Sequence, residues 1–132
     1  MTGECRLDLA PDADGAQVAA ESARGLLLDA DPESAFACEL SVAEACANVV
    51  EHTSSSRLRV VIRRRPMAFS VAICDDGAPF TLPLVPGMPP PEATAGRGVA
   101  LMAGCMDRVR LVRVGDENRL LMARRIVPAE AR

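Results

Sequence analysis

Residues 40–52 read LSVAEACANVVEH, a pattern typical of a helix with small or apolar residues on most of its sides. Three polar side chains, Glu44, Asn48 and His52, recur in this stretch every four residues. Because an α-helix completes a turn in about 3.6 residues, these side chains are expected to lie along one face. Such a face is ordinarily the solvated stripe of an amphipathic helix. It is also a place where a carboxylate could act as a general base and an asparagine carbonyl could bind Mg²⁺.

The composition indicates one domain with an aliphatic core. The chain has 132 residues, 49% hydrophobic and only 2% aromatic, so we expect residues 1–132 to form a single domain. The formal net charge is −3, which disfavours direct binding of nucleic acid by bulk charge. All 15 basic residues are arginine, which excludes lysine chemistry such as a P-loop or a Schiff base.

Cysteine usage favours a reducing compartment. The five cysteines are scattered singly, without a C-x-x-C pair, and the chain does not start with a signal-peptide pattern. With one histidine, the sequence offers too few ligands for a structural zinc site. No apolar run approaches the roughly 20 residues that span a bilayer. We therefore expect a cytoplasmic protein with no membrane contact.

Strand and helix patterns surround residues 40–52 on both sides. The predicted elements are a strand at 5–9, a helix at 16–28 capped by Asp12 or Asp14, a helix at 32–52 (continuous, or bent near 40–41), strands at 58–63 and 69–74 joined through 64–68, a Pro- and Gly-rich loop at 81–95, a short helix at 99–105, and strands at 108–114 and 119–127 around a turn at 115–118. This order predicts an α+β fold, a two-layer α/β sandwich with helices on one face of a mainly antiparallel mixed sheet.

A second candidate motif, Asp75-x-Gly77, ends the strand predicted at 69–74. Asp and Gly are standard turn residues, so an ordinary strand-ending turn would explain them. In a binding site, the carboxylate could accept a hydrogen bond from an exocyclic amine. The missing Cβ of Gly77 would let a flat ring approach the backbone.

A third candidate motif, Gly96-Arg97-Gly98, stands between the loop and the short helix. It could be a flexible hinge that closes the long loop. It could also bind phosphate, because free N–H groups at a helix N-terminus point toward an anion. Arg97 would then add a charge-assisted contact.

In this order and spacing, the three motifs resemble the N, G1 and G2 boxes of the Bergerat-fold ATPases, a superfamily that includes gyrase, histidine kinases and the mismatch-repair ATPases. The resemblance rests on Glu44-Ala45-x-x-Asn48-x-x-x-His52, Asp75-x-Gly77-x-Pro79-Phe80 and Gly96-Arg97-Gly98-Val99-Ala100-Leu101-Met102. The compact size and the Glu-x-x-x-Asn-x-x-x-His form are similar to the anti-sigma-factor serine kinases of bacterial partner-switching systems.

The resemblance implies a role for each position. Asn48 would hold Mg²⁺ between the phosphates of ATP, and Glu44 would be the general base that deprotonates the attacking hydroxyl. Asp75 would bind the adenine amine, with Gly77 beside the ring. The remaining contacts to the nucleotide would come from Gly96, Arg97, Gly98 and Met102.

The resemblance also implies a function. The protein would be a serine/threonine protein kinase that uses ATP and Mg²⁺, phosphorylates an anti-sigma antagonist, sequesters a sigma factor and forms a homodimer. The chain departs from the family pattern at Ala100, where a glycine is usual, and at Asn118-Arg119-Leu120, where the family often has Gly-Thr beside the base. The loop predicted at 81–95, which the resemblance implies is the lid over the phosphates, is also short and proline-rich. These departures motivate an alternative function, a non-catalytic regulatory module, either nucleotide-binding or purely protein-binding, that sequesters a partner.

Overall fold

All predicted helices and strands are present, in the predicted order. The computed structural model describes residues 2–80 and 97–127. The elements are β1 (Gly3–Leu9), α1 (Ala13–Gly25), α2 (Pro32–His52), β2 (Leu58–Arg65), β3 (Ala68–Asp75), α3 (Arg97–Cys105), β4 (Arg108–Val114) and β5 (Glu117–Arg125).

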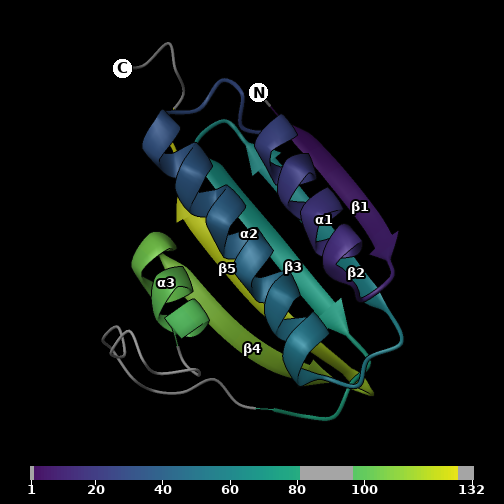
Figure 1. The fold of residues 1–132 in the computed structure, drawn as a ribbon. Helices are drawn as coiled ribbons and strands as arrows, with labels where there is room; N and C mark the ends of the chain where they lie inside the picture. Colours follow the sequence, from purple (N-terminus) through teal and green to yellow (C-terminus); the bar gives the residue numbers. More distant parts are fainter. Residues whose placement is uncertain (1, 81–96, 128–132) are drawn as a thin grey trace.

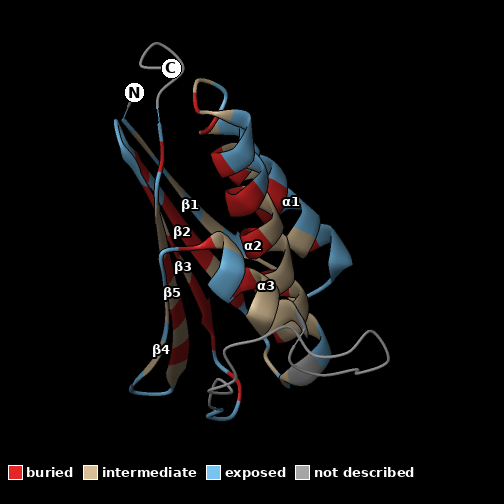
Figure 2. Ribbon diagram, turned by 90° about the vertical axis from the view of Figure 1, so that its left-hand side faces the viewer, coloured by how far each residue is buried: buried red, intermediate tan, exposed pale blue. Residues whose placement is uncertain are grey.

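The strands form one sheet in the order β1-β2-β3-β5-β4. The helices lie together on one face of this sheet, with α2 between α1 and α3 (Figure 1). Seen edge-on, a layer of strands stands beside a layer of helices (Figure 2). The predicted α+β two-layer sandwich is confirmed. The sheet is more regular than the predicted mixed sheet, because every pairing between described strands is antiparallel.

Helix α2 begins where Asp31 and Pro32 fix its first turn. The Asp31 Oδ2 atom accepts a hydrogen bond from the backbone N–H of Ser34 at 2.9 Å, and Pro32 has the φ angle that a first helical residue needs. Asp31 Oδ1 accepts another from the N–H of Val127 at 3.0 Å, which ties the segment after β5 to the start of α2. The helix runs without a break through residues 40–41, because buried residues continue across them at helical spacing.

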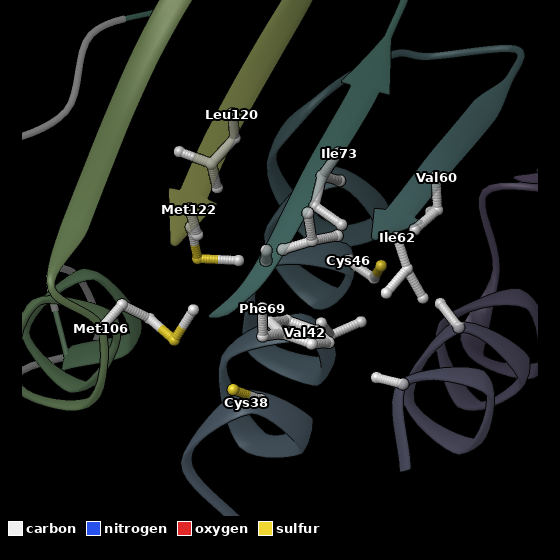
Figure 3. Close-up of a cluster of buried hydrophobic side chains, with 14 of the residues drawn as sticks. Cys38, Val42, Cys46, Val60, Ile62, Phe69, Ile73, Met106, Leu120 and Met122 are labelled. Atoms are coloured by element: carbon white, nitrogen blue, oxygen red, sulfur yellow. The ribbon is translucent and has the colours of Figure 1, made fainter. Parts of the chain in front are cut away.

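An apolar core lies between α2 and the middle of the sheet (Figure 3). Its central members are Cys38, Val42, Cys46 and Val49 of α2, Val60 and Ile62 of β2, Phe69, Val71 and Ile73 of β3, and Leu120 and Met122 of β5. Burial raises the pKa of the Cys38 and Cys46 thiols to about 12, so both are protonated at neutral pH and pack as small apolar groups. All five cysteines of the chain are free thiols.

Helix α1 lies closer to the N-terminus than the predicted range 16–28. Of the two candidate caps, Asp12 is the one used: its Oδ1 accepts a hydrogen bond from the N–H of Gly15 at 2.8 Å. At the other end, the N–H groups of Leu26 and Leu27 bond to carbonyls three residues back, which tightens the last turn and ends the helix early.

The last hairpin is tighter than the turn predicted at 115–118. Only Gly115 and Asp116 separate β4 from β5. Gly115 has a φ of 59°, the left-handed conformation that a two-residue hairpin turn favours and that glycine adopts without strain. The strand therefore starts earlier than predicted, and Asn118 lies within β5 rather than in the turn.

We predict that Asp31→Ala lowers the free energy of unfolding at pH 7 by about 1–2 kcal/mol, the usual effect of removing a helix N-cap. Burial acts to raise the pKa of Asp31, but the N–H groups of Ser34 and Val127 outweigh it and hold the pKa below its ordinary value of 3.8. This stabilisation is present above pH 3.8 and is lost as the pH falls through the lower folded-state pKa. Urea unfolding of wild type and Asp31→Ala, from pH 7 down through this pKa, measures the loss of stabilisation.

The matched control is Asp14→Ala, which removes an exposed carboxylate from the first turn of α1 without removing its cap. We expect a much smaller effect from this control. A stability difference between wild type and Asp31→Ala that stays constant into strong acid would contradict the assigned role of the carboxylate.

Candidate functional site

The polar face of α2 lies against the start of α3. Glu44 and Asn48 are half-buried, so they are not part of a fully solvated stripe. A Cβ atom at Gly98 would lie 2.9 Å from Glu44 Oε2 and 3.6 Å from both Oδ1 and Nδ2 of Asn48. The structure therefore brings together three residues that the sequence motifs singled out from two distant segments.

Position 98 lies close to the end of the Glu44 side chain. A methyl group there would press against the Glu44 carboxylate, which would have to move aside. Helix α3 begins one residue earlier, at Arg97, so its first-turn N–H groups have no partner within the helix. A helix N-terminus attracts negative charge, and the Glu44 carboxylate already lies beside it. The start of α3 can therefore attract an anion, and the Glu44 carboxylate is the anionic side chain that the structure places beside it.

Asp75, at the end of β3, is buried and is held through one of its two oxygens. Its Oδ1 accepts hydrogen bonds from Ser55 Oγ at 2.8 Å, from the N–H of Gly77 at 2.8 Å and from Asn118 Nδ2 at 3.1 Å. Its Oδ2 receives no hydrogen bond from any described residue. An oriented acceptor atom with spare capacity is what a carboxylate needs in order to bind an amine donor.

Asn118 is the main residue that the sequence interpretation missed. It is buried, lies directly opposite Asp75 in the β3–β5 pairing, and also donates from Nδ2 to the carbonyl of Ala78 at 3.0 Å. Arg113 Nη1 donates to Asn118 Oδ1 at 3.1 Å and to the carbonyl of Gly77 at 2.8 Å. The residue that stands where the family often has Gly-Thr therefore fastens the turn after β3. The sequence signal for this role was a polar residue, Asn118, at a position of β5 whose side chain faces the helices.

Two hydroxyl groups connect the end of α2 to Asp75. Thr53 Oγ1 donates to the carbonyl of Val49 at 2.7 Å and lies 2.6 Å from Ser55 Oγ. Ser55 Oγ in turn donates to Asp75 Oδ1 at 2.8 Å. The polar segment that follows α2, which contains Thr53 and Ser55, is therefore part of the site and not a plain linker.

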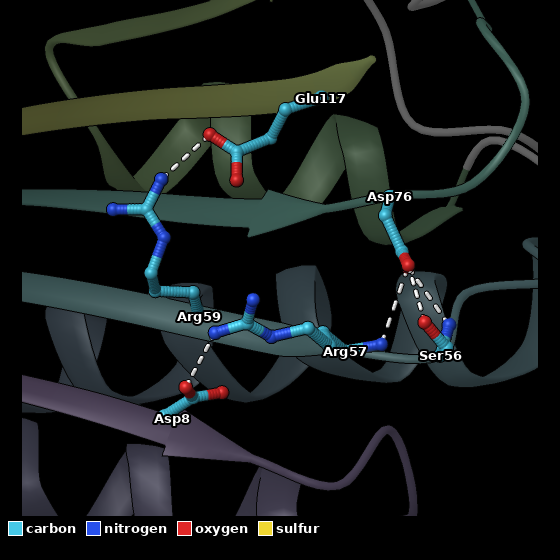
Figure 4. Close-up of polar contacts among 6 residues, drawn as sticks. All are labelled: Asp8, Ser56, Arg57, Arg59, Asp76 and Glu117. Atoms are coloured by element: carbon cyan, nitrogen blue, oxygen red, sulfur yellow. Dashed lines mark hydrogen bonds and ion pairs between the residues drawn. The ribbon is translucent and has the colours of Figure 1, made fainter.

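Asp76 has a structural role that distinguishes it from its neighbour Asp75. Its carboxylate accepts hydrogen bonds from the Ser56 side chain, from the Ser56 N–H at 2.8 Å and from the Arg57 N–H at 3.2 Å (Figure 4). The Ser56 side chain is the strongest of several hydrogen bonds that lower the pKa of Asp76 below 3.8. These bonds join the loop after α2 to the end of β3, so Asp76 has a structural role. Asp75 is the carboxylate that has one oxygen, Oδ2, without a hydrogen bond from any described residue.

Gly77 is needed first by the protein's own packing. A Cβ there would lie 2.8 Å from Ser55 Oγ, 2.9 Å from Asp75 Oδ1 and 3.0 Å from Thr53 Cβ. The sequence interpretation left two explanations for this glycine, a strand-ending turn and the approach of a flat ring. The close contacts within the chain already require the position to be glycine.

Other predicted site residues are described less fully. Gly96 lies outside the described residues, and His52 and Arg97 are described only as the last residue of α2 and the first of α3. Met102 is wholly buried in the core cluster, the usual place of a methionine on a short helix. Its contact with a nucleotide stays a prediction.

Metal and membrane features are limited in the described part of the chain. Residues 2–80 and 97–127 contain no group of three or more His, Cys, Asp or Glu side chains that could bind a metal by themselves. None of the helices described is long and apolar enough to cross a membrane.

Comparison with known proteins shows the family of the chain. Residues 9–124 match the family model of the histidine kinase-like ATPase domain. The chain belongs to this family. Membership implies binding of ATP, and the Bergerat-type fold expected from the sequence is confirmed. No curated protein matches the chain.

Among solved structures, the chain is similar to the crystal structure of the RsbU and RsbW domains of Rv1364c from Mycobacterium tuberculosis. The TM-score is 0.67 and the sequence identity 13%, over 94% of this chain and 32% of the other. The chain therefore spans about a third of that protein, and at this identity the likeness concerns the fold.

We predict that Asn118→Ala lowers the free energy of unfolding by about 1–3 kcal/mol, because buried acceptors on Asp75 and Ala78 lose their donor. Arg119→Ala is the matched control, since this neighbour in β5 has its side chain on the opposite face of the sheet. Urea unfolding at neutral pH measures both. Equal stability of the Asn118 variant and wild type would contradict the structural role of the amide.

Proposed function

We propose that this member of the histidine kinase-like ATPase family is an ATP-dependent serine/threonine protein kinase that acts as an anti-sigma factor. One observation carries the proposal: α2 connects two candidate binding positions of different chemistry, a hydrogen-bond acceptor at one and a helix N-terminus at the other. At its C-terminal end, Asp75 Oδ2 is left without a described partner beside Gly77. One and two turns earlier, Asn48 and Glu44 lie against Gly98 at the start of α3. A nucleotide needs these two kinds of site, one for its base and one for its phosphates.

The base would be bound at Asp75. Three donors converge on Oδ1 and restrain the carboxylate, so Oδ2 faces a ligand in a fixed orientation. A carboxylate oxygen accepts hydrogen bonds and cannot donate them when ionised. It therefore favours adenine, which presents an exocyclic amine, over guanine, which presents a carbonyl at the corresponding position.

The phosphates would lie at the start of α3. The free N–H groups of its first turn and the side chain of Arg97 supply positive partial or full charge. Gly98 has no side chain to obstruct the approach, and Met102 anchors this helix in the core. A nucleotide chain is anionic, which fits the electrostatics of a helix N-terminus.

The donor set fits Mg²⁺ shared with the phosphates. Asn48 offers a side-chain oxygen beside Gly98, and Mg²⁺ typically takes only one or two protein ligands and keeps phosphate oxygens and waters as the others. When bound, the ion neutralises charge on the phosphates. Because residues 2–80 and 97–127 hold no group of three or more metal-binding side chains, phosphate oxygens and waters would have to complete the coordination of the ion.

Glu44 would act as the general base. Its carboxylate accepts the proton of the substrate serine or threonine hydroxyl as the new oxygen–phosphorus bond forms. The bond between the γ-phosphorus and the bridging oxygen breaks, and ADP leaves with that oxygen. The chain's other residues contribute by orienting the nucleotide, because phosphoryl transfer depends mainly on positioning and electrostatic stabilisation.

The substrate and partners follow from the sequence resemblance. It supports an antagonist protein as the phosphorylation substrate, a sigma factor as the sequestered partner and a homodimer as the assembly. The similarity to a structure of RsbU and RsbW domains is in keeping with this choice.

A second candidate function is a regulatory module without catalysis. Asn118 favours it, because the family often has a threonine near the base, whereas the buried amide of Asn118 bonds within the protein to Asp75 Oδ1 and so one expected contact to the base is missing. Titration of the protein with a fluorescent ATP analogue, with and without Mg²⁺, separates the two functions. The kinase requires Mg²⁺-dependent binding, and absence of binding at millimolar nucleotide favours the module.

For the kinase, we predict that Glu44→Gln reduces phosphotransfer at least about 100-fold while nucleotide affinity stays within a few-fold of wild type. The amide keeps the shape of the carboxylate but does not take up a proton. The measurement is transfer from radiolabelled ATP to candidate antagonist proteins of the same genome. Undiminished transfer would eliminate Glu44 as the base.

Two further variants complete this experiment. Asn48→Ala should remove the Mg²⁺-dependent part of ATP affinity, which calorimetry measures directly. Glu33→Gln removes an exposed carboxylate from the first turn of the same helix and should change neither transfer nor affinity.

A further inference from the structure

The face of the sheet opposite the helices is strongly basic. No described helix covers it (Figure 2). Because successive side chains of a strand point to opposite faces of the sheet, the pairing register shows which charged residues lie on this face. These are Glu4, Arg6, Asp8, Arg59, Arg63, Arg65, Arg108, Arg110, Glu117, Arg119 and Arg125. Eight arginines face three carboxylates, an excess of five positive charges on a chain whose net charge is −3.

Apolar side chains form the centre of this face. One row across the sheet pairs Arg6 with Val61, Val61 with Ala72, Ala72 with Leu121, and Leu121 with Arg110. The row is apolar in the middle and ends in an arginine at each edge strand. A hollow of about 310 Å³ lies over its centre, and a second of about 450 Å³ adjoins it through residues that line both.

Part of the positive charge has no partner within the described chain. The three carboxylates pair with Arg6, Arg59, Arg63 and Arg119 of this face and with Arg57 beside it. Figure 4 shows two of these pairs, Arg59 with Glu117 and Arg57 with Asp8. The side chains of Arg65, Arg108, Arg110 and Arg125 make no ion pair with any described residue. Three of these four line the two hollows. The charge is therefore available for carboxylates of another molecule.

We propose that this basic face binds an acidic amphipathic helix of a partner protein, with its apolar side chains on the Val61–Ala72–Leu121 row and its carboxylates on the surrounding arginines. The inner strands β2, β3 and β5 each have a neighbouring strand on both sides, so their backbone groups are already hydrogen-bonded within the sheet. A partner that binds this face therefore has to satisfy its own backbone hydrogen bonds. A helix satisfies its own backbone and can lay one apolar side on the sheet. The same sheet already packs helices in this way on its other face.

A second copy of the chain and nucleic acid fit this face less well. Two copies packed face to face would bring like charges together, which opposes association. Single-stranded nucleic acid is usually bound by aromatic side chains that stack on bases. The chain has no Trp or Tyr, and none of its three Phe residues belongs to the basic face. The inference does not depend on nucleotide binding at the other side of the molecule.

The test uses a fluorescent synthetic peptide of about 18 residues, five helical turns, with leucine along one side and glutamate on the others. Fluorescence anisotropy measures its affinity for wild type, for Arg108→Glu/Arg110→Glu and for Arg24→Glu. Arg24 is the control because it lies on α1, in the helix layer. We expect the double variant to weaken binding at least about tenfold, Arg24→Glu to have little effect, and added salt to weaken binding to wild type.

Circular dichroism verifies that each variant is folded, and Leu121→Gln tests the apolar row without changing charge. A version of the peptide with lysine in place of glutamate should not bind. The proposal is overturned by equal affinity of wild type and the double variant, or by absence of binding. It is also overturned if sedimentation shows self-association that the double variant abolishes, or if duplex DNA binds this face more tightly than the acidic peptide.

Discussion

The site depends on the buried carboxylate of Asp75. A buried carboxylate is costly unless hydrogen bonds satisfy it, and no arginine side chain bonds to it among the described residues. Its donors come from three segments: Ser55 after α2, Gly77 after β3, and Asn118 in β5. These segments cannot separate without leaving the carboxylate unsatisfied. One interaction therefore fixes where the helix layer, the end of β3 and the start of β5 meet.

Helix α2 carries this constraint to the other end of the site. Its last turn bonds to Thr53, which lies beside Ser55, the donor to Asp75. Further back along the helix, Asn48 and Glu44 lie next to Gly98 of α3, close enough to touch a side chain at that position. The apolar side of α2 is packed on β3 and β5, so the helix itself is held rigidly. A ligand bound at Asp75 and a ligand bound at α3 would be positioned by the same helix.

Local patterns in the sequence predicted a large part of this arrangement. The four-residue spacing of Glu44 and Asn48 depends only on helix geometry, and the alternation in β2 and β3 depends only on strand geometry. The role of Asn118 depends on which residue lies across the β3–β5 pairing, a register that no local pattern encodes. The extent of α1 was decided by Asp12, one of two equally placed cap candidates. The contact between Gly98 and Glu44 requires the packing of α2 on α3, which the sequence indicated only through a family resemblance.

The most direct test is a crystal structure of the protein with Mg²⁺ and a non-hydrolysable ATP analogue. The account predicts the adenine amine within hydrogen-bond distance of Asp75 Oδ2, while Oδ1 keeps its bonds to Ser55, Gly77 and Asn118. It predicts the phosphates between Asn48 and the first turn of α3. A nucleotide bound elsewhere, or one whose base makes no contact with Asp75, would contradict it.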